Sequence, residues 1–185
     1  MLAERLRAAG HAVVLTREPG GSAGAEEIRS LVLEGDPDRW SPETEILLFT
    51  AARRDHLERV IRPAISAGKI VICDRFSDST RVYQGVSRGD LRDIVDQLHD
   101  LMIGQEPDLT FLVDLDPETG LRRALSRRGS EERFEDFGLD MQIRMRRAFL
   151  DLAKDHPERF RPIDGSGGKD AVADLIDAEL AEVMG

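Results

Sequence analysis

Four short apolar runs, separated by segments with helical periodicity, constrain the fold of this chain more than any other feature. The runs are four to seven residues long, which is typical of buried strands and short for helices. Because a strand, a helix and a second strand in succession form a right-handed crossover, we expect an α/β fold with a parallel sheet. The four expected strands are residues 12–15, 69–73, 109–115 and 160–163.

The segments around these runs carry apolar residues at helical spacing, so we expect a helix in each. Ser41 and Pro42 have the residue types of an N-cap and a first helical position. Pro63 is expected to bend the long helix that follows them. The expected helices are residues 1–10, 23–34, 41–67, 89–103, 117–127, 137–154 and 169–184.

The composition excludes several classes of protein. The 185 residues carry 26 basic and 36 acidic side chains and a net charge of −10, so we expect no general nucleic-acid-binding surface. No apolar run approaches the roughly 20 residues of a membrane span, and we expect no membrane partner. Cys73 is the single cysteine, which excludes an internal disulfide and favours a cytoplasmic location. The length and the lack of a linker predict one domain over residues 1–185.

Ligands of parallel α/β sheets bind at the carboxyl ends of the strands, so the loops that follow the strands are the candidate site. Residues 16–21, Thr-Arg-Glu-Pro-Gly-Gly, follow the first strand, and their glycine turn would let the backbone approach a ligand closely. A plain turn with a surface ion pair explains this segment better when it is taken alone. Asp74 and Arg75 follow the second strand. There a carboxylate can hold Mg²⁺ through water and an arginine can bind a phosphate, although a capping aspartate paired with its neighbour is the alternative.

Two further groups could bind a base or a sugar. Phe49 and Arg53 are four residues apart on one face of the expected long helix, where a ring and a guanidinium could bind a planar base. The alternative is a core position for Phe49 and a surface position for Arg53. Past the second strand, a group of polar side chains could line a base or a sugar. The alternative is the polar start of a helix. These residues are Ser79, Thr80, Tyr83 and Gln84.

Arginines are crowded around a Gly-Ser-Glu-Glu segment at residues 129–132. Arginines on a mobile segment can close over a phosphoryl group and stabilise the charge of its transition state. A solvated helix face is the alternative, but the density of arginines favours the functional interpretation. The crowded arginines are Arg122, Arg123, Arg127, Arg128 and Arg133.

Together these motifs resemble the thymidylate kinase family along the whole chain. The segments that carry the resemblance are residues 16–21, 47–49, 52–53, 74–75, 83–85, 107–110, 112–115, 117–118, 120–121 and 133–135. The resemblance implies a three-layer parallel sheet of the P-loop NTPase nucleoside monophosphate kinase type. It also implies transfer of a phosphoryl group from ATP to dTMP with Mg²⁺, and a homodimer.

The resemblance implies a role for each candidate residue. Phe49 would stack on thymine, Arg53 would reach a thymine carbonyl or the monophosphate, and Arg75 would hold the phosphate beside the metal ligand Asp74. Residues 127–136 would form a lid. The implied substrate-binding residues are Glu18, Pro19, Phe49, Arg53, Arg75, Ser79, Thr80, Tyr83 and Gln84. The implied catalytic residues are Asp74, Arg75, Arg128 and Arg133, and the implied ATP-binding residues are Arg123, Arg127 and Gly165.

One family motif is not found in the sequence: a first strand followed by a Gly-x-x-x-x-Gly-Lys-Ser/Thr loop that cradles the phosphates of ATP. Residues 165–170, Gly-Ser-Gly-Gly-Lys-Asp, have neither the first glycine at the right spacing nor the final hydroxyl. We therefore expect about 25 residues to be missing before Met1, because the gene start was placed too late or the chain was shortened. The missing strand would be the central one, so its neighbours would leave a gap or close up. The chain would then be inactive alone.

Two other functions stay open. A non-catalytic nucleotide-binding or dimerisation protein derived from a kinase would explain the missing phosphate loop directly. Another nucleoside monophosphate kinase is a third possibility, and the resemblance at Phe49, Arg53 and residues 83–85 argues against it.

Overall fold

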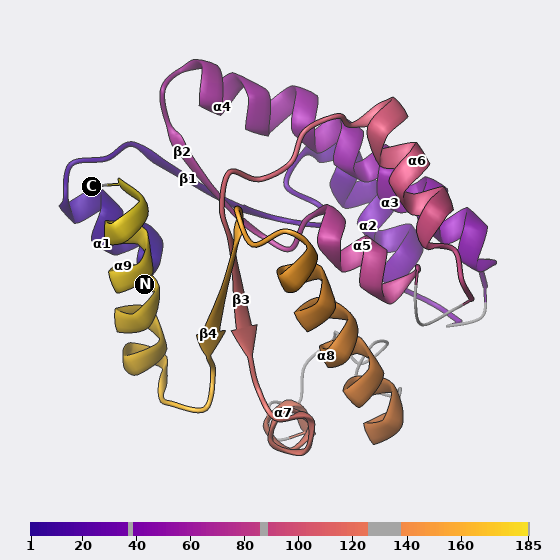
Figure 1. The fold of residues 1–185 in the computed structure, drawn as a ribbon. Helices are drawn as coiled ribbons and strands as arrows, with labels where there is room; N and C mark the ends of the chain where they lie inside the picture. Colours follow the sequence, from indigo (N-terminus) through magenta and orange to yellow (C-terminus); the bar gives the residue numbers. More distant parts are fainter. Residues whose placement is uncertain (37–38, 86–88, 126–137, 185) are drawn as a thin grey trace. The chain divides into compact units, whose positions relative to one another are not determined.

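The computed structural model describes residues 1–36, 39–85, 89–125 and 138–184 (Figure 1). The chain divides into two compact units, one of residues 1 and 3–106 and one of residues 2 and 107–185. Each unit contains one pair of parallel strands. No helix in the described ranges is both long enough and apolar enough to cross a membrane.

The first unit is built on the parallel strands β1 (Val13–Arg17) and β2 (Ile70–Asp74). Arg17 pairs with Asp74, so both strands end at the same level. The loops that follow them are therefore neighbours, and the Glu18 amide donates to the Asp74 carbonyl at 2.9 Å. The helices of this unit are α1 (Leu2–Ala8), α2 (Ala23–Leu33), α3 (Pro42–His56), the π-helical turn η1 (Leu57–Ile61), α4 (Arg62–Ser66), α5 (Ser77–Tyr83) and α6 (Arg92–Met102).

Helix α3 begins where the sequence predicts and continues into an irregular turn. Ser41 is its N-cap and accepts the Thr44 amide at 3.2 Å, while Pro42 occupies the first helical turn. The irregularity expected at Pro63 is observed as η1, which ends two residues before that proline. Pro63 has no N–H to donate to the preceding turn, and a π-helical turn accommodates the lost hydrogen bond.

The apolar core of the first unit fixes the end of α3 against β2. Leu57, Ile61 and Ile103 are buried together, and Val71 and Phe76 pack against them. Figure 1 shows α2, α3, α5 and α6 grouped together. Because this core holds η1 and β2, the last turns of α3 have a defined position beside the loop after β2.

The second unit is built on a second parallel pair, β3 (Thr110–Asp114) and β4 (Phe160–Asp164). Asp114 pairs with Asp164, so these strands also end at the same level. Its buried residues include Met145, Phe160 and Ile163. The helices of this unit are α7 (Pro117–Leu125), α8 (Gly138–Asp155) and α9 (Lys169–Met184).

All four expected strands are confirmed, and both pairs are parallel as expected. Among the described residues, the strands form two separate parallel pairs, and no described strand joins β1–β2 to β3–β4. The three-layer sheet without its central strand stays a prediction. The expectation of buried strands is wrong at Leu15 and Val113, which are 61% and 49% exposed.

Candidate active site

The loop after β1 is a glycine turn that helix α2 holds in place. Gly20 and Gly21 have φ angles of +125° and +87°, which residues with a Cβ rarely adopt. Glu26 Oε1 accepts the Gly21 amide at 2.8 Å, and Arg29 Nη1 donates to the Pro19 carbonyl at 2.7 Å. The position of this loop is therefore set by side chains of α2.

A buried ion pair joins this loop to α3. Arg53 Nε donates to Glu18 Oε2 at 2.7 Å, and Arg53 Nη2 donates to Thr80 Oγ1 at 2.9 Å. The side chains of Glu18 and Arg53 are each 4% exposed, so their pairing has to offset a large cost of desolvation. The alternatives of a surface ion pair at Glu18 and a surface position for Arg53 are wrong.

The Arg53 guanidinium has one nitrogen that no described residue binds. Among the described residues, its hydrogen-bond partners lie at Nε and Nη2, and none lies at Nη1. Its Cζ lies 5.2 Å from the ring centroid of Phe76. Phe49 is buried one turn earlier on the same helix. An available N–H and aromatic rings close along the chain can recognise a planar base with carbonyl groups.

Arg75 follows β2 in a backbone conformation that is rare for residues with a Cβ. Its φ is +65°, in the left-handed region, which costs on the order of 1 kcal/mol for a non-glycine residue. Its Cζ lies 5.1 Å from the ring centroid of Tyr83. The residue is exposed, so the guanidinium can reach a ligand from the end of the strand.

Helix α5 carries the polar residues that the sequence places after β2. Its N-cap is Phe76, so Ser79 and Thr80 lie within the helix, and their alternative role as N-caps is wrong. Thr80 and Gln84 are buried and lie one turn apart, while Ser79 and Tyr83 are half-buried. The structure links Thr80 to Arg53 and Tyr83 to Arg75.

Asp74 is the candidate metal ligand. Its carboxylate is exposed and makes no hydrogen bond or ion pair with any described residue, so the alternative of a capping pair with Arg75 is wrong. The described residues contain no group of three acidic, histidine or cysteine side chains that could bind a metal alone. Mg²⁺ commonly takes one or two carboxylates together with waters and substrate phosphates, and a lone carboxylate at a strand end fits that coordination.

Cys73 lies beside this site and has no covalent role. Burial raises the pKa of its thiol, and the negative charge of Glu18 raises it further. The thiol lies 3.1 Å from the Arg75 carbonyl oxygen, to which it donates. Because the reactive form of cysteine is the thiolate, this side chain is not a nucleophile at neutral pH.

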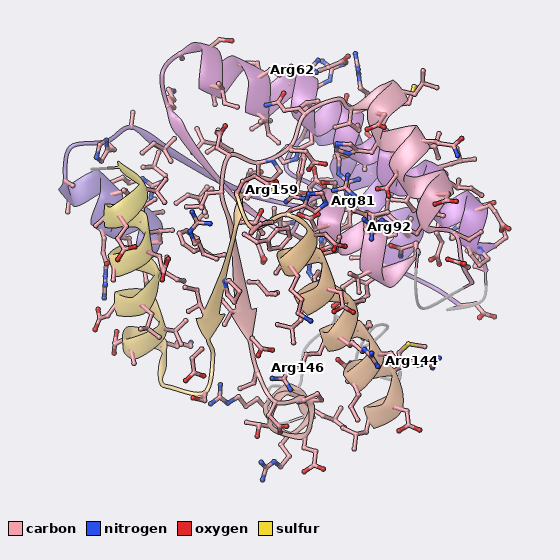
Figure 2. The ribbon with its side chains drawn as sticks, viewed as in Figure 1. Arg62, Arg81, Arg92, Arg144, Arg146 and Arg159 are labelled. Carbon is pink, nitrogen blue, oxygen red and sulfur yellow. The ribbon has the colours of Figure 1, made fainter. Side chains whose placement is uncertain are left out.

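A charged network fixes α5 against α6, in which Arg81 and Arg92 both pair with Asp96; both arginines are labelled in Figure 2. Arg81 donates to Asp78 at 2.9 Å, to Asp96 at 2.7 Å and to Glu106 at 2.6 Å. Burial raises the pKa of Glu106, but hydrogen bonds from His99 and Arg81 outweigh it and hold this pKa well below its usual range. Since α5 also carries Thr80 and Tyr83, this network supports one side of the site.

In the second unit, the predicted ATP-binding residues Arg123 and Gly165 are in direct contact. Arg123 donates to the carbonyl oxygens of Gly165 at 3.0 Å and Ser166 at 2.8 Å. The Gly165 amide donates to the Asp114 carbonyl at 2.7 Å. A Cβ on Gly165 would lie 2.8 Å from that carbonyl oxygen, so only glycine fits between these groups.

Asp114 at the end of β3 forms a two-pronged ion pair with Arg146 of α8 (Figure 2), at 2.6 and 2.8 Å. The Arg146 hydrogen bonds lower the pKa of Asp114. Arg146 also lines a cavity of about 400 Å³ with Asp116, Pro117 and Leu150. None of the predicted site residues that the structure describes lines this cavity.

Known proteins with similar sequences are thymidylate kinases. The family model "Thymidylate kinase" matches residues 1–176. A thymidylate kinase of Ruegeria pomeroyi is 72% identical over all of this chain and 85% of its own length. One of Dinoroseobacter shibae is 63% identical over 97% of this chain and 86% of its own length. The chain belongs to the thymidylate kinase family. A crystal structure of thymidylate kinase from Ehrlichia chaffeensis, 33% identical, matches 100% of this chain and 88% of its own with a TM-score of 0.76.

Several of the residues predicted from the resemblance to thymidylate kinases lie together in the first unit. Glu18, Arg53 and Thr80 are joined by hydrogen bonds, and Arg75 contacts Tyr83. No bond joins the side chains of Ser79 and Gln84 to these groups. The expected lid, residues 127–136, with Arg127, Arg128 and Arg133, lies outside the described residues.

Sequence reasoning missed His56 as a member of this candidate site, and it missed the contact of His56 with Thr16 of the candidate segment 16–21. His56 is fully buried and lies within 3.3 Å of Glu18 Oε1 and 2.7 Å of Thr16 Oγ1. One signal could have found His56, because it lies three residues after Arg53 and seven after Phe49, on one helical face. No comparable signal was available for the pairing of Thr16 with His56, because the two residues are 40 positions apart.

Proposed function

We propose that this protein transfers the γ-phosphoryl group of ATP to dTMP, giving dTDP and ADP. Family membership supports the reaction, and one observation supports its acceptor site: the buried hydrogen-bonded set of Glu18, Arg53 and Thr80 beside the ends of β1 and β2. A nucleotide at this place would meet the carboxyl ends of two parallel strands, where ligands of α/β sheets bind.

The thymine base is held, in this proposal, by α3. Arg53 has an N–H group at Nη1 for a thymine carbonyl, and Glu18 and Thr80 prevent the guanidinium from turning away. Phe49 stacks on the ring. The substrate-lining residues Pro19, Ser79, Thr80, Tyr83 and Gln84 contact the base and the deoxyribose.

The phosphate of dTMP is held by Arg75 at the end of β2. The ring of Tyr83 beside this guanidinium limits where it can point. Asp74 is the residue that would hold Mg²⁺, which neutralises phosphate charge when it is bound. The chain's own contribution is to orient the acceptor phosphate and to keep an unpaired carboxylate next to it.

In the second unit, we assign Arg123 and Gly165 to the ATP-binding region. The hydrogen bonds from Arg123 to the Gly165–Ser166 backbone give that loop a defined conformation. Residues 127–136 are assigned to a lid, with Arg127 binding ATP and Arg128 and Arg133 stabilising the transferred phosphoryl group.

We also propose that both parallel pairs belong to a single domain with one sheet of the P-loop NTPase type, whose central strand is not among the described residues. Each pair ends in an edge with no described strand beside it, and exposed edges of this kind favour pairing. The exposed apolar side chains of Leu15 and Val113 fit a sheet that further structure covers.

A cytoplasmic homodimer completes the proposal. Large apolar side chains are exposed on α2, α3 and α6, including Leu31 at 41%, Leu47 at 57% and Leu101 at 79%. Such side chains on neighbouring helices favour association of two copies. Sedimentation of the wild-type protein and of Leu47→Glu would test this, because a dimer through this face should weaken in the variant.

Calorimetric titration with dTMP, dCMP and GMP tests the acceptor site directly. We expect dTMP to bind and the other two to bind at least tenfold more weakly, since their bases present different donors and acceptors to Arg53. Equal binding of all three would contradict a thymidylate site. The alternative of a non-catalytic nucleotide-binding protein is less favoured, because the relatives are thymidylate kinases over almost the whole chain.

A further inference from the structure

His56 ends α3 inside the first unit, three residues after Arg53. Its ring is 0% exposed, and both ring nitrogens have partners. Nδ1 lies 3.3 Å from Glu18 Oε1, and Nε2 lies 2.7 Å from Thr16 Oγ1. The imidazole therefore contacts both Thr16 at the end of β1 and Glu18 just before the glycine turn.

The glycine turn also rests on this imidazole. A Cβ on Gly21 would overlap both His56 Nε2 and Thr16 Oγ1, so the backbone of the turn lies directly against the pair. Thr16 belongs to β1, Gly21 to the turn and His56 to α3. The ring thus connects three separate parts of the site through atoms that are closed to solvent.

The two partners select one arrangement of protons on the ring. A carboxylate only accepts hydrogen bonds, so Nδ1 has to carry the proton that points to Glu18. In the neutral ring, the Thr16 hydroxyl then donates to Nε2. Both oxygens of the Glu18 carboxylate are occupied as a result, Oε1 by His56 and Oε2 by Arg53.

We propose that His56 is a positioning residue of the dTMP site, which holds Glu18 in the orientation that fixes Arg53. The inference rests on the proposed function, in which Arg53 contacts the thymine base. Without the Nδ1 donor, Glu18 Oε1 loses its partner and the carboxylate can rotate. Arg53 then loses a fixed acceptor at Nε and keeps only the Thr80 contact.

Two variants of His56 separate positioning from simple packing. In His56→Asn, the side-chain amide can take the place of Nδ1 and still donate to Glu18. In His56→Gln, the amide reaches the place of Nε2, and the bond to Glu18 is lost. Calorimetry should give a dTMP affinity within about threefold of wild type for His56→Asn and about tenfold weaker for His56→Gln. Both variants remove a buried ring, so both should lower the melting temperature.

A double variant tests whether His56 acts through Glu18. If it does, His56→Gln should add almost nothing to the loss of dTMP affinity caused by Glu18→Gln, because contacting residues are not additive. Independent, additive losses would overturn the proposal. Equal dTMP affinities for the folded variants His56→Asn and His56→Gln and for the wild type would also overturn it.

A measurement on the wild-type protein keeps the proposal testable if the variants do not fold. The nitrogen-15 resonances of the buried His56 ring should show a proton on Nδ1 and none on Nε2 in the neutral ring. A proton on Nε2 alone would overturn the proposal, since Nδ1 could not donate to Glu18. Failure of the wild type to bind dTMP would instead overturn the proposed function, whatever the state of the ring.

Discussion

Arg53 and Arg75 are both assigned to dTMP binding, but Arg53 is buried and Arg75 is exposed. Arg53 is 4% exposed and shares its charge with Glu18, so its role depends on the buried hydrogen bonds around it. Arg75 is exposed and sits at a φ of +65°, so its role depends on the backbone that presents it. Substitutions at the two positions should therefore differ in what they change.

Replacing Arg75 should weaken dTMP binding without unfolding the protein. Arg75→Ala and Arg75→Gly both remove the guanidinium, and each should raise the Kd for dTMP about 30-fold, as for the loss of a charge-assisted pair. Arg75→Gly should be more stable than Arg75→Ala by about 0.5–1 kcal/mol, because glycine adopts a positive φ without strain. Calorimetry and urea unfolding measure the two effects.

Arg54→Ala serves as the control for this experiment. Arg54 lies on α3 beside Arg53 but pairs with Glu58 at the surface, so its loss should leave the dTMP affinity unchanged. An unchanged Kd in both Arg75 variants would rule out the assignment of this residue to the phosphate.

At the scale of elements, the position of α5 depends on a network centred on Arg81. This guanidinium is 7% exposed and pairs with carboxylates from α5, from α6 and from the segment before β3. The three carboxylates are close to one another only because Arg81 lies between them. Helix α5 also carries Thr80 and Tyr83, so the position of these two site residues depends on the Arg81 network.

Arg81→Met should destabilise the protein strongly. The variant leaves three carboxylates near each other without the guanidinium, and breaking a buried ion pair by removing one partner costs about 3–5 kcal/mol. Urea unfolding would measure the loss. Arg59→Met is the matched control, because that side chain is 70% exposed and pairs with Asp55 at the surface. A small and similar loss of unfolding free energy in Arg81→Met and Arg59→Met would contradict the central role of Arg81.

The same network predicts how stability changes with pH. The pKa of Glu106 is lower in the folded protein than in the unfolded chain, where it is about 4.3. Its contribution to stability is therefore complete above about pH 5 and is lost as the pH falls below 4. We expect the free energy of unfolding to decline from pH 5 to pH 2, and to decline less steeply in Glu106→Gln.

Thermal melts at steps of half a pH unit would measure this decline. Glu58→Gln is a suitable control, since Glu58 is a surface partner of Arg54 and its variant should keep the slope of the wild type. Identical slopes for Glu106→Gln and wild type would exclude Glu106 as a source of acid sensitivity.

At the scale of the whole molecule, the residues proposed to bind dTMP and the residues proposed to bind ATP differ in their motifs. The residues assigned to dTMP lie in the first unit, where Glu18, Arg53 and Thr80 form one contacting group and Arg75 and Tyr83 form another. No Gly-x-x-x-x-Gly-Lys-Ser/Thr segment occurs among the 185 residues, and the lysines, Lys69, Lys154 and Lys169, do not occur in such a motif. Binding of the acceptor and transfer of the phosphoryl group should therefore be separable.

A polypeptide of these 185 residues alone should bind dTMP and form no measurable dTDP. Phosphoryl transfer depends on holding ATP in line with the acceptor, and a misplacement of about 1 Å already costs about 10²-fold in rate. A coupled assay for ADP release, on protein free of host kinase, measures this. Robust formation of dTDP by this polypeptide would contradict the prediction.

Local sequence signals were sufficient for the four strands and most helices, but not for α5 or η1. The runs that became β1 to β4 are apolar and short, and Ser41 and Pro42 have the residue types of a helix start. Of the segments expected after the first two strands, residues 18–21 and Arg75 follow them, while Thr16, Arg17 and Asp74 are the last residues of the strands. These features depend on residues close in the chain, whose conformational preferences are expressed before any tertiary contact forms. Motif resemblance then supplied the family, which the comparisons confirmed.

Only the tertiary structure decided which side chains meet. Glu18 and Arg53 are 35 residues apart, Thr80 is a further 27 residues on, and Thr16 and His56 are separated by 40 residues. Their burial also could not be predicted, because each residue is polar and would be solvated unless a distant partner offset the cost. An apolar run determines that a strand forms, whereas its neighbours depend on packing across the whole chain.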